Sequence, residues 1–477
     1  MHARLAALEP MLRDAGQGHL LKFAGSLDES RAEAMADQIE AIEFGRLAVL
    51  LDRYVLSKPE FSLPEGVEPA GFFAHDPAQS ELAYDHAAMH AVGEGLLRAG
   101  KVAAFVVAGG QGSRLGFDGP KGCYPAGAVT GKPLFRFFAE QLLAAERKHR
   151  RPVPWYVMTS PLNHGATVAF FEEHDHFGLA ANQIRFFSQG TMPSFDMASG
   201  KILLADEGTI ATNPDGHGGS ITALEKSGSL ADMRDRGIEH VSYFQVDNPI
   251  VRILDPVFLG LHAEGPGSSG EASSKMLPKA FAEEKMGMFT NDNGRTRVIE
   301  YSDLPMERQR ETNDDGTLRF LAGSPAIHLF SVAFLERLNR EARFALPFHR
   351  AEKKIPHLDV KTGERVEPSS PNGVKLEQFV FDALPMAEGS IVYESSRQRE
   401  FAPIKNAQGA DSPASSAQIQ TERAAAMLQK LGVAVPRNTE GAADCVIELS
   451  PLTAQDPGDF DASELPAGIE RGEKIAL

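Results

Sequence analysis

The feature that most constrains this chain is an apolar strand that runs directly into a glycine-rich loop. Residues 102–108 read VAAFVVA, and Gly109, Gly110 and Gly112 follow at once. A continuous apolar run of this length predicts a strand buried on both faces, as in a parallel sheet covered by helices. Glycine lets backbone N–H groups approach a ligand closely, and such groups bind anions. The segment therefore predicts a phosphate-binding loop at the end of a strand.

Two cations follow the glycines and support this interpretation. The loop reads GGQGSRLG, then FD, then GPK, so that it carries Arg114 and Lys121. Its spacing is not that of the Rossmann fingerprint, because Leu115 stands where a third glycine is needed. It is not the Walker pattern either, because Lys121 follows Pro120. A glycine-rich turn that only tightened a connection would leave both cations without a role.

The pattern of elements predicts an α/β fold. Strand and helix patterns alternate over residues 102–395, which favours a mostly parallel, Rossmann-like sheet flanked by helices. Pro133 is expected to open an amphipathic helix, and Ser26 and Glu29 have the spacing of a capping box. Strands are expected at 102–108, 153–158 and 240–246. We expect an N-terminal helical region (1–97), a central α/β domain (98–395) and a small C-terminal lobe (396–477).

Composition excludes several classes of protein. The 477 residues carry a net charge of -17, which argues against a nucleic-acid surface. Only Cys123 and Cys445 are present, so neither a disulfide framework nor a thiolate metal site is expected. No apolar run approaches the length of a membrane span, and the first residues lack the apolar core of a signal peptide. We therefore expect a cytoplasmic protein with neither nucleic acid nor membrane as a partner.

Polar residues at the ends of predicted strands are candidates for the chemistry. Gln189 carries an amide that both donates and accepts, as the edge of a uracil ring requires. Asp247 suits Mg²⁺, which prefers one or two carboxylates together with phosphate oxygens and water, although such a residue also caps turns. Glu300 can accept hydrogen bonds from two sugar hydroxyls. The glycines around Gly216 indicate either a tight turn or a site for phosphate or sugar hydroxyls, and Lys405 contributes a cation.

Taken in order, these segments resemble the UDP-N-acetylhexosamine pyrophosphorylases of eukaryotic type, a family of sugar-nucleotide pyrophosphorylases. The resemblance extends over nearly the whole chain, and it implies that residues 98–395 form a catalytic nucleotidyltransferase domain. Besides the glycine loop it rests on GQGHLLKF (16–23), MTS (158–160), FFSQG (186–190), PDGHGG (214–219), VDN (246–248), VIEYS (298–302), KKIP (353–356), PNGVK (371–375), FVFD (379–382) and FAPIKN (401–406).

The resemblance implies a uridylyltransferase that converts UTP and a sugar 1-phosphate into a UDP-sugar and pyrophosphate with Mg²⁺. N-acetylglucosamine 1-phosphate would be its sugar substrate. The residues that it implies around the uridine are Val107, Ala108, Gly109, Gly110, Gln189 and Gly216. It implies that Arg114 and Lys121 hold the leaving pyrophosphate, that Lys405 contacts the reacting phosphates, and that Asp247 binds metal and nucleotide. Those that it implies around the sugar are His217, Glu300, Tyr301, Ser324, Phe379 and Phe381.

Two positions depart from the family pattern, and both concern the sugar. His217 stands where the acetylhexosamine enzymes carry Asn and the glucose-type enzymes carry His. Ser324 replaces an Asn that is expected to reach the sugar. A UTP–glucose or UTP–galactose 1-phosphate uridylyltransferase therefore remains an alternative, and so does a non-catalytic UDP-sugar sensor. A nicotinamide dehydrogenase is disfavoured by the spacing of the glycine loop.

Overall fold

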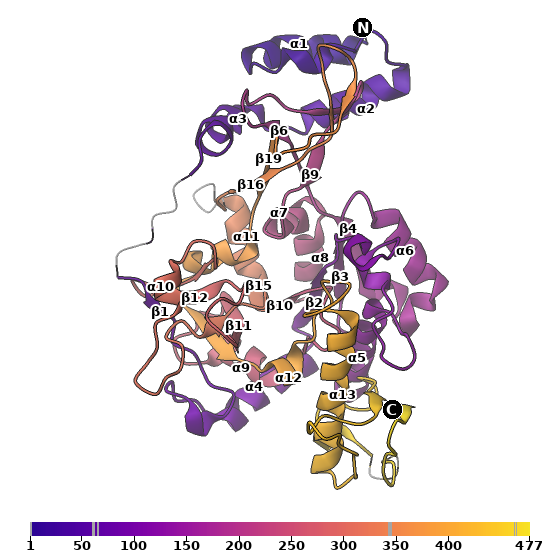
Figure 1. Cartoon of the computed structure of the whole chain (residues 1–477), viewed down its shortest axis with the longest axis vertical. Coiled ribbons are helices and arrows are strands. Elements are labelled where there is room, and N and C mark those ends of the chain that lie inside the picture. Colours follow the sequence, from indigo (N-terminus) through magenta and orange to yellow (C-terminus); the bar gives the residue numbers. More distant parts are fainter. Residues whose placement is uncertain (1, 60–62, 64–65, 342–345, 462, 464) are drawn as a thin grey trace. The chain divides into compact units, whose positions relative to one another are not determined.

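The computed structural model describes residues 2–59, 63, 66–341, 346–461, 463 and 465–477. The chain divides into two compact units, each built from separate stretches of sequence (Figure 1). The small unit comprises Met1–Ser62, Gln189–Ser220 and Leu346–Asp382, and the large unit comprises Leu63–Ser188, Ile221–Ala345 and Ala383–Leu477. The predicted three-part division at residues 97/98 and 395/396 stays a prediction. No helix in the described part of the chain has the length and apolarity needed to cross a membrane.

The large unit is organised around one sheet. Among the described residues, eleven strands pair in the order β1-β12-β14-β11-β15-β10-β2-β3-β4, with β13 beside β12 and β20 beside β11. The strands are β1 (Glu68–Pro69), β2 (Val102–Val107), β3 (Trp155–Thr159), β4 (Ile184–Ser188), β10 (His240–Gln245), β11 (Ala272–Pro278), β12 (Met288–Asp292), β13 (Arg295–Ile299), β14 (Ala322–Gly323), β15 (His328–Ser331) and β20 (Ser390–Glu394).

Strands β10, β2, β3 and β4 are parallel, as the sequence predicts. Val107 at the end of β2 lies opposite Gln245 at the end of β10 and opposite Met158 near the end of β3. The loops that leave these strands therefore start at one edge of the sheet. This edge is where an α/β sheet binds its ligands.

The prediction of a mostly parallel sheet needs correction for the other half, because the sheet as a whole is mixed. Strand β15 runs antiparallel to both β10 and β11, and β12 and β13 form a hairpin. Asn293 and Gly294 close that hairpin with φ angles of 52° and 84°, the left-handed pair that a two-residue turn requires. Short turns of this kind connect neighbouring strands in opposite directions, whereas parallel neighbours need a longer crossover, usually a helix.

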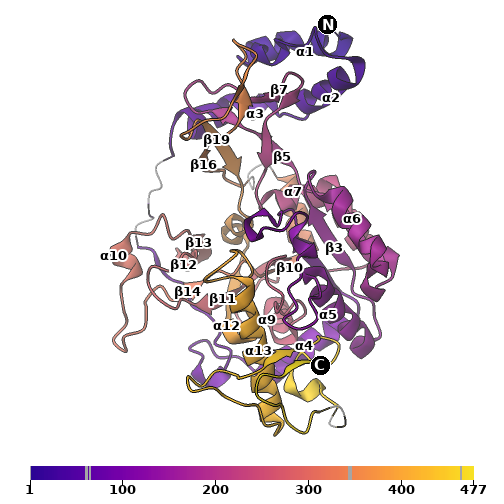
Figure 2. The ribbon, with the colours of Figure 1, turned by 45° about the vertical axis from the view of Figure 1, so that its right-hand side comes forward.

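Helices cover both faces of the parallel half. Ala104, Val106 and Val157 face a core shared with α4 (His86–Arg98), α5 (Leu134–His149), α6 (His164–Glu173) and α9 (Pro256–Glu264). Side chains alternate along a strand, and Tyr156 points the other way, where its hydroxyl bonds Asp232 of α8 (Ser229–Asp235) at 2.7 Å. Figure 2 shows α5 and α6 beside β3. The predicted helix after Pro133 is confirmed as α5, with Pro133 at its N-cap.

The C-terminal part of the large unit has a core of its own. It packs α13 (Pro413–Lys430) against β21 (Val446–Glu448), which pairs with β22 (Lys474–Ala476). Helix α7 (Gly219–Lys226) begins in the small unit's stretch Gln189–Ser220 and continues into the large unit. The large unit also contains α10 (Met306–Gln309), α11 (Val332–Arg340) and α12 (Arg397–Glu400).

The small unit packs helices on short antiparallel strands. Its helices are α1 (Ala3–Asp14), α2 (Glu29–Glu40) and α3 (Phe44–Leu50). Its strands pair as β19 (Gly373–Glu377) with both β16 (His349–Lys353) and β6 (Phe195–Asp196), β5 (Thr191–Pro193) with β9 (Thr212–Pro214), β17 (His357–Leu358) with β18 (Arg365–Val366), and β7 (Leu204–Asp206) with β8 (Thr209–Ile210).

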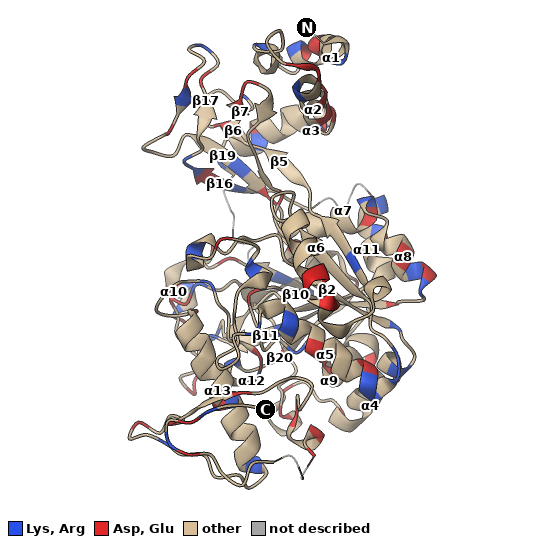
Figure 3. Cartoon of the chain, turned by 90° about the vertical axis from the view of Figure 1, so that its right-hand side faces the viewer, with Lys and Arg blue, Asp and Glu red and all other residues tan. Residues whose placement is uncertain are grey.

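Helix α2 shows how this unit is held and corrects one prediction. Met35 and Ile39 are buried in one core with Phe195 and Val374, whereas the other side of α2 gathers acidic residues (Figure 3). The predicted capping box at Ser26 is wrong. The helix begins at Glu29, so Asp28 is the N-cap and accepts from the backbone N–H of Arg31. Ser26 lies before the cap, and its hydroxyl donates to the carbonyl of Phe23.

Candidate active site

The glycine loop after β2 is braced from both sides. The N–H of Gly112 donates to the carbonyl of Gly119 at 2.9 Å, and the N–H of Lys121 donates to that of Gly110 at 3.0 Å. The buried side chain of Asn163 donates to the carbonyls of Ala108 and Gly110, at 3.0 and 3.3 Å. Gly110 itself is exposed, and a Cβ added there would have no atom within 4 Å. The loop is thus held in shape while leaving room for a ligand against its backbone.

Lys121 and Asp247 face one another beside this loop. The Lys121 Nζ lies 3.8 Å from an Asp247 carboxylate oxygen, and only 16% and 12% of the two side chains are exposed. Burial lowers the pKa of Lys121, the Asp247 carboxylate opposes that change, and the nearby cations Lys405 and Arg114 lower the pKa further. Arg114 itself is exposed on a short turn. A cluster of mutually repelling cations around one carboxylate is an environment that favours a polyanion.

Lys405 is held near this cluster by a backbone hydrogen bond of the preceding residue. The N–H of Ile404 donates to the carbonyl of Asp247 at 2.8 Å. The Lys405 ammonium lies 3.7 Å from a carboxylate oxygen of Asp411 and 5.3 Å from the centre of the Phe401 ring. The structure therefore brings together three sequence-predicted residues from distant segments, Lys121, Asp247 and Lys405.

The predicted metal ligand is the carboxylate of Asp247, which lies beside Lys121. In the described part of the chain no three His, Cys, Asp or Glu side chains form a metal-binding group. A closed protein site for zinc is therefore not available there. Mg²⁺ needs only one or two carboxylates when phosphate oxygens and water complete its shell. Asp247 matches that requirement.

Two of the predicted sugar-binding residues flank Gly287. The N–H of Ser324 donates to the Gly287 carbonyl at 2.8 Å. A Cβ added at Gly287 would lie 3.1 Å from the Glu300 carboxylate. Tyr301, which follows Glu300 after the end of β13, is 38% exposed. Glu300 and Ser324 therefore both lie beside Gly287, although they belong to separate loops.

The remaining predicted residues belong to the small unit, where the second glycine cluster packs on Gln378. The N–H of Gly218 donates to the Gln378 carbonyl, and the Gln378 N–H donates to the Asp215 carbonyl, both at 2.8 Å. Gly216 has a φ of +86°, and a Cβ there would lie 2.4 Å from the Gln378 carbonyl oxygen. Only glycine fits this position. Gln189 lies directly after β4 and is 7% exposed.

His217 belongs to an aromatic stack in the same unit. Its ring lies parallel to that of Phe379, 5.1 Å away, and 5.7 Å from that of Phe381. Burial and the nearby His349 lower the pKa of His217 to about 4. The N–H of Val380 donates to its Nδ1 at 3.1 Å. His217 is thus neutral at physiological pH with its proton on Nε2, which can donate one hydrogen bond.

Sequence reasoning missed the residues that support this site. Asn163 braces the glycine loop, Asn248 contacts the segment before Lys405, and His349 stacks on Phe379 at 4.1 Å. The position of Asn248 beside Asp247 was the one available signal. The partners of all three come from remote segments, which local patterns do not reveal.

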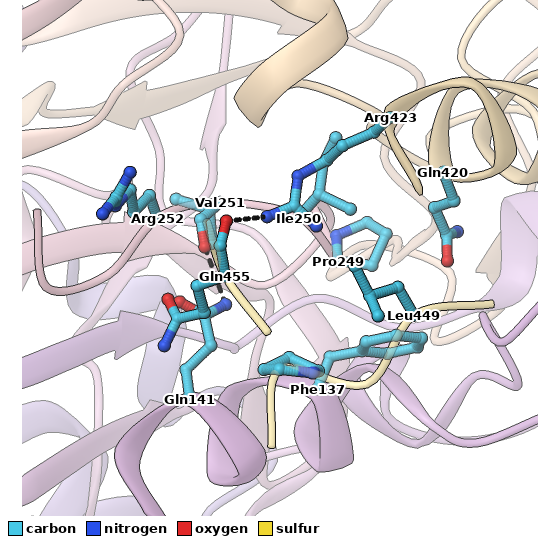
Figure 4. Close-up of a pocket in the computed structure, with 11 residues that line it drawn as sticks. Phe137, Gln141, Pro249, Ile250, Val251, Arg252, Gln420, Arg423, Leu449 and Gln455 are labelled. Atoms are coloured by element: carbon cyan, nitrogen blue, oxygen red, sulfur yellow. Dashed lines mark hydrogen bonds between the residues drawn. The ribbon is translucent and has the colours of Figure 1, made fainter. Parts of the chain in front are cut away.

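Two cavities in the described part of the chain lie away from the predicted residues. One of about 20 Å³ lies between α5, α13 and the loop after β10 (Figure 4). A groove of about 420 Å³ runs along the ends of α4 and α5. Neither is lined by a predicted site residue. The smaller one has room for a water molecule rather than a substrate.

Comparison with known proteins gives one consistent result. A family model described as UTP–glucose-1-phosphate uridylyltransferase matches residues 76–430. UDP-N-acetylglucosamine pyrophosphorylase of Saccharomyces cerevisiae is 34% identical over 441 residues, which are 88% of this chain and 91% of the yeast protein. UDP-N-acetylhexosamine pyrophosphorylase-like protein 1 of Xenopus tropicalis is 35% identical over 415 residues, 83% of this chain and 79% of that protein.

Solved structures agree. The uridine diphosphate N-acetylglucosamine pyrophosphorylase of Trypanosoma brucei, solved with an inhibitor, aligns with a TM-score of 0.79 and 26% identity over 98% of both chains. A UDP-glucose pyrophosphorylase mutant of Leishmania major aligns with a TM-score of 0.58 and 16% identity, over 91% of this chain and 87% of that one. The second likeness concerns the fold alone.

Proposed function

Because this chain belongs to the UTP–glucose-1-phosphate uridylyltransferase family, we propose that it joins UTP to N-acetylglucosamine 1-phosphate, producing UDP-N-acetylglucosamine and pyrophosphate. The names of the yeast and Trypanosoma relatives support this choice of sugar. The observation that carries the reaction type is the cluster of Lys121, Asp247 and Lys405 beside the braced glycine loop.

The reaction needs charge neutralisation and alignment rather than a general base. A phosphate oxygen of the sugar 1-phosphate, already ionised near neutral pH, attacks the α-phosphorus of UTP. The bond from that phosphorus to the oxygen bridging the α- and β-phosphates breaks, and pyrophosphate leaves with the electron pair. Two polyanions must therefore be held in line, and preorganised cations lower the barrier.

We assign the nucleotide contacts as follows. The backbone of Val107, Ala108, Gly109 and Gly110 would bind the uridine, together with Gln189 and Gly216. Arg114 and Lys121 would hold the leaving pyrophosphate, and Lys405 would contact the phosphates that react. Asp247 would hold Mg²⁺, which supplies positive charge to the phosphate oxygens when it is bound. The exposed backbone of Gly110 and the lowered pKa of Lys121 support these roles.

The sugar would be bound by polar groups from loops and by aromatic rings. Glu300 would accept from sugar hydroxyls, with Ser324 beside it and Tyr301 next in the chain. His217 would donate one hydrogen bond from Nε2, and Phe379 and Phe381 would contact the N-acetyl group. A glucose or galactose 1-phosphate substrate is the second candidate, because His217 is the residue that glucose-type enzymes carry.

Pyrophosphate release tests the proposal directly. The protein is mixed with UTP, Mg²⁺ and, in separate reactions, N-acetylglucosamine, N-acetylgalactosamine, glucose or galactose 1-phosphate. We expect the highest kcat/KM with N-acetylglucosamine 1-phosphate. Release only with glucose or galactose 1-phosphate would transfer the assignment to the second candidate. Binding of UTP without any release would instead identify a UDP-sugar sensor.

A further inference from the structure

We propose that Asn248 is a positioning residue that sets the place of Lys405 relative to Asp247. The proposal rests on the proposed function, since it concerns how the reacting phosphates meet their cation. It assigns a task to a side chain that touches no substrate. It also explains how Asp247 and Lys405, which are far apart in the sequence, are held at a fixed spacing.

The Asn248 amide clamps the chain that leads to Lys405. Its Nδ2 donates to the Glu400 carbonyl at 2.6 Å, and its Oδ1 accepts from the Ala402 N–H at 3.0 Å. The residue is 5% exposed, so water does not compete for either bond. Both partners are backbone groups of residues 400–405, which we call the lysine segment. One planar amide thus fixes two successive points of that segment.

Two further hydrogen bonds hold the lysine segment. The N–H of Ile404 donates to the Asp247 carbonyl at 2.8 Å. The carbonyl of Ala402 accepts from the hydroxyl of Ser416, on α13, at 2.7 Å. Asp247 and Asn248 are adjacent residues, so the same loop that presents the carboxylate also holds the segment that presents the ammonium. The spacing between carboxylate and cation therefore depends on this clamp.

The start of the lysine segment has an independent anchor. The buried ammonium of Lys275 lies 2.6 Å from the Glu400 carboxylate and 2.7 Å from that of Asp255. Asp255 is also the N-cap of α9. Because this ion group holds Glu400 without help from Asn248, loss of the Asn248 amide should loosen residues 402–405 without unfolding the unit.

The chain offers a matched control on the other side of the same loop. The amide of Gln141, 4% exposed on α5, donates to the Val251 carbonyl at 2.8 Å and accepts from the Ile253 N–H at 3.1 Å. Figure 4 shows its bond to Val251. This is the same chemistry on the same loop, but it does not contact the lysine segment.

Steady-state kinetics separate positioning from general destabilisation. A misplacement near 1 Å costs about 100-fold in rate, so we expect Asn248→Ala to lower kcat about 100-fold, with the KM for UTP within about threefold of wild type. Asn248→Asp has the same size but lacks the donor, so it should show a similar loss. Gln141→Ala should keep kcat within about threefold. In a Lys405→Ala background, Asn248→Ala should lower kcat by less than about threefold further, because both changes remove the same contact between Lys405 and the reacting phosphates.

Hydrogen exchange tests the two Asn248 hydrogen bonds whether or not the protein is catalytically active. The amides of Ala402 and Ile404 should exchange at least about tenfold faster in Asn248→Ala than in wild type or Gln141→Ala. Unchanged exchange there would overturn the proposal. So would equal kcat losses in Asn248→Ala and Gln141→Ala, or full activity of Asn248→Asp. Absence of pyrophosphate release by the wild type would contradict the proposed function alone and leave the exchange result to decide the clamp.

Discussion

Replacing Lys405 by alanine should remove catalysis while leaving the fold almost unchanged. The Lys405 side chain is 44% exposed, and its ion pair with Asp411 spans 3.7 Å between groups that water reaches. Exposed pairs of this kind contribute about 0.2–1 kcal/mol to stability. The Phe401 ring, 5.3 Å away, adds about 0.5–1 kcal/mol through its cation–π contact. Unfolding free energy should therefore fall by less than about 2 kcal/mol.

The expected loss of rate is larger than this structural cost. A preorganised charge that contacts the transition state contributes about 2.7–4 kcal/mol, equivalent to roughly 100- to 1,000-fold in kcat. Pyrophosphate release from UTP, Mg²⁺ and N-acetylglucosamine 1-phosphate measures kcat, and urea unfolding measures stability. Lys101→Ala serves as the control. Lys101 forms an exposed ion pair with Glu239, in which the charged atoms lie 2.6 Å apart, and it does not belong to the cluster.

Two outcomes for Lys405→Ala would contradict a catalytic role of this lysine. If Lys405→Ala kept kcat within about threefold of wild type, Lys405 would have no contact with the reacting phosphates. A stability loss well above that of Lys101→Ala, with a parallel loss of rate, would make its role structural. We expect neither outcome.

Asp247→Asn should lower kcat at least about 100-fold and flatten the response to Mg²⁺, because the metal loses its carboxylate, and titration of pyrophosphate release with Mg²⁺ measures both. His217→Asn should raise kcat/KM for N-acetylglucosamine 1-phosphate relative to glucose 1-phosphate, since Asn is the residue of the acetylhexosamine enzymes. The pKa of His217 is about 4 in the folded protein and 6.5 in the unfolded chain, so the folded state binds fewer protons between these values. The folded state therefore loses stability as pH falls from 6.5 towards 4. Urea unfolding across that pH range should show a smaller loss of stability for His217→Asn than for the wild type. Gly216→Ala should lower the unfolding temperature more than Gly363→Ala in a thermal melt. Both have positive φ, but the new Cβ would lie 2.4 Å from the Gln378 carbonyl oxygen at Gly216 and 3.9 Å from the nearest atom at Gly363, which adds about 1–3 kcal/mol of overpacking.

Local sequence patterns predicted the elements that depend on neighbours in the chain. The apolar run before Gly109 is confirmed as β2, the segment after Pro133 as α5, and the predicted strand at 240–246 as β10. Each has a periodicity or a run length of its own. The antiparallel half of the sheet was not predicted, although Asn293-Gly294 is a strong hairpin signal. Strand direction there depends on which strands pair, and pairing joins segments far apart in sequence.

Local patterns in the sequence account for the chemistry that this chain offers, namely a glycine loop at a strand end, cations at Arg114 and Lys121, and a carboxylate at Asp247. Those properties belong to the residues and to their order. Which of these groups meet depends on the fold, because a hydrogen bond forms only when donor and acceptor lie about 3 Å apart, whatever their separation in the sequence. Asn248 bonds a carbonyl 152 residues further along the chain. Its role therefore exists in the fold and not in the sequence around it.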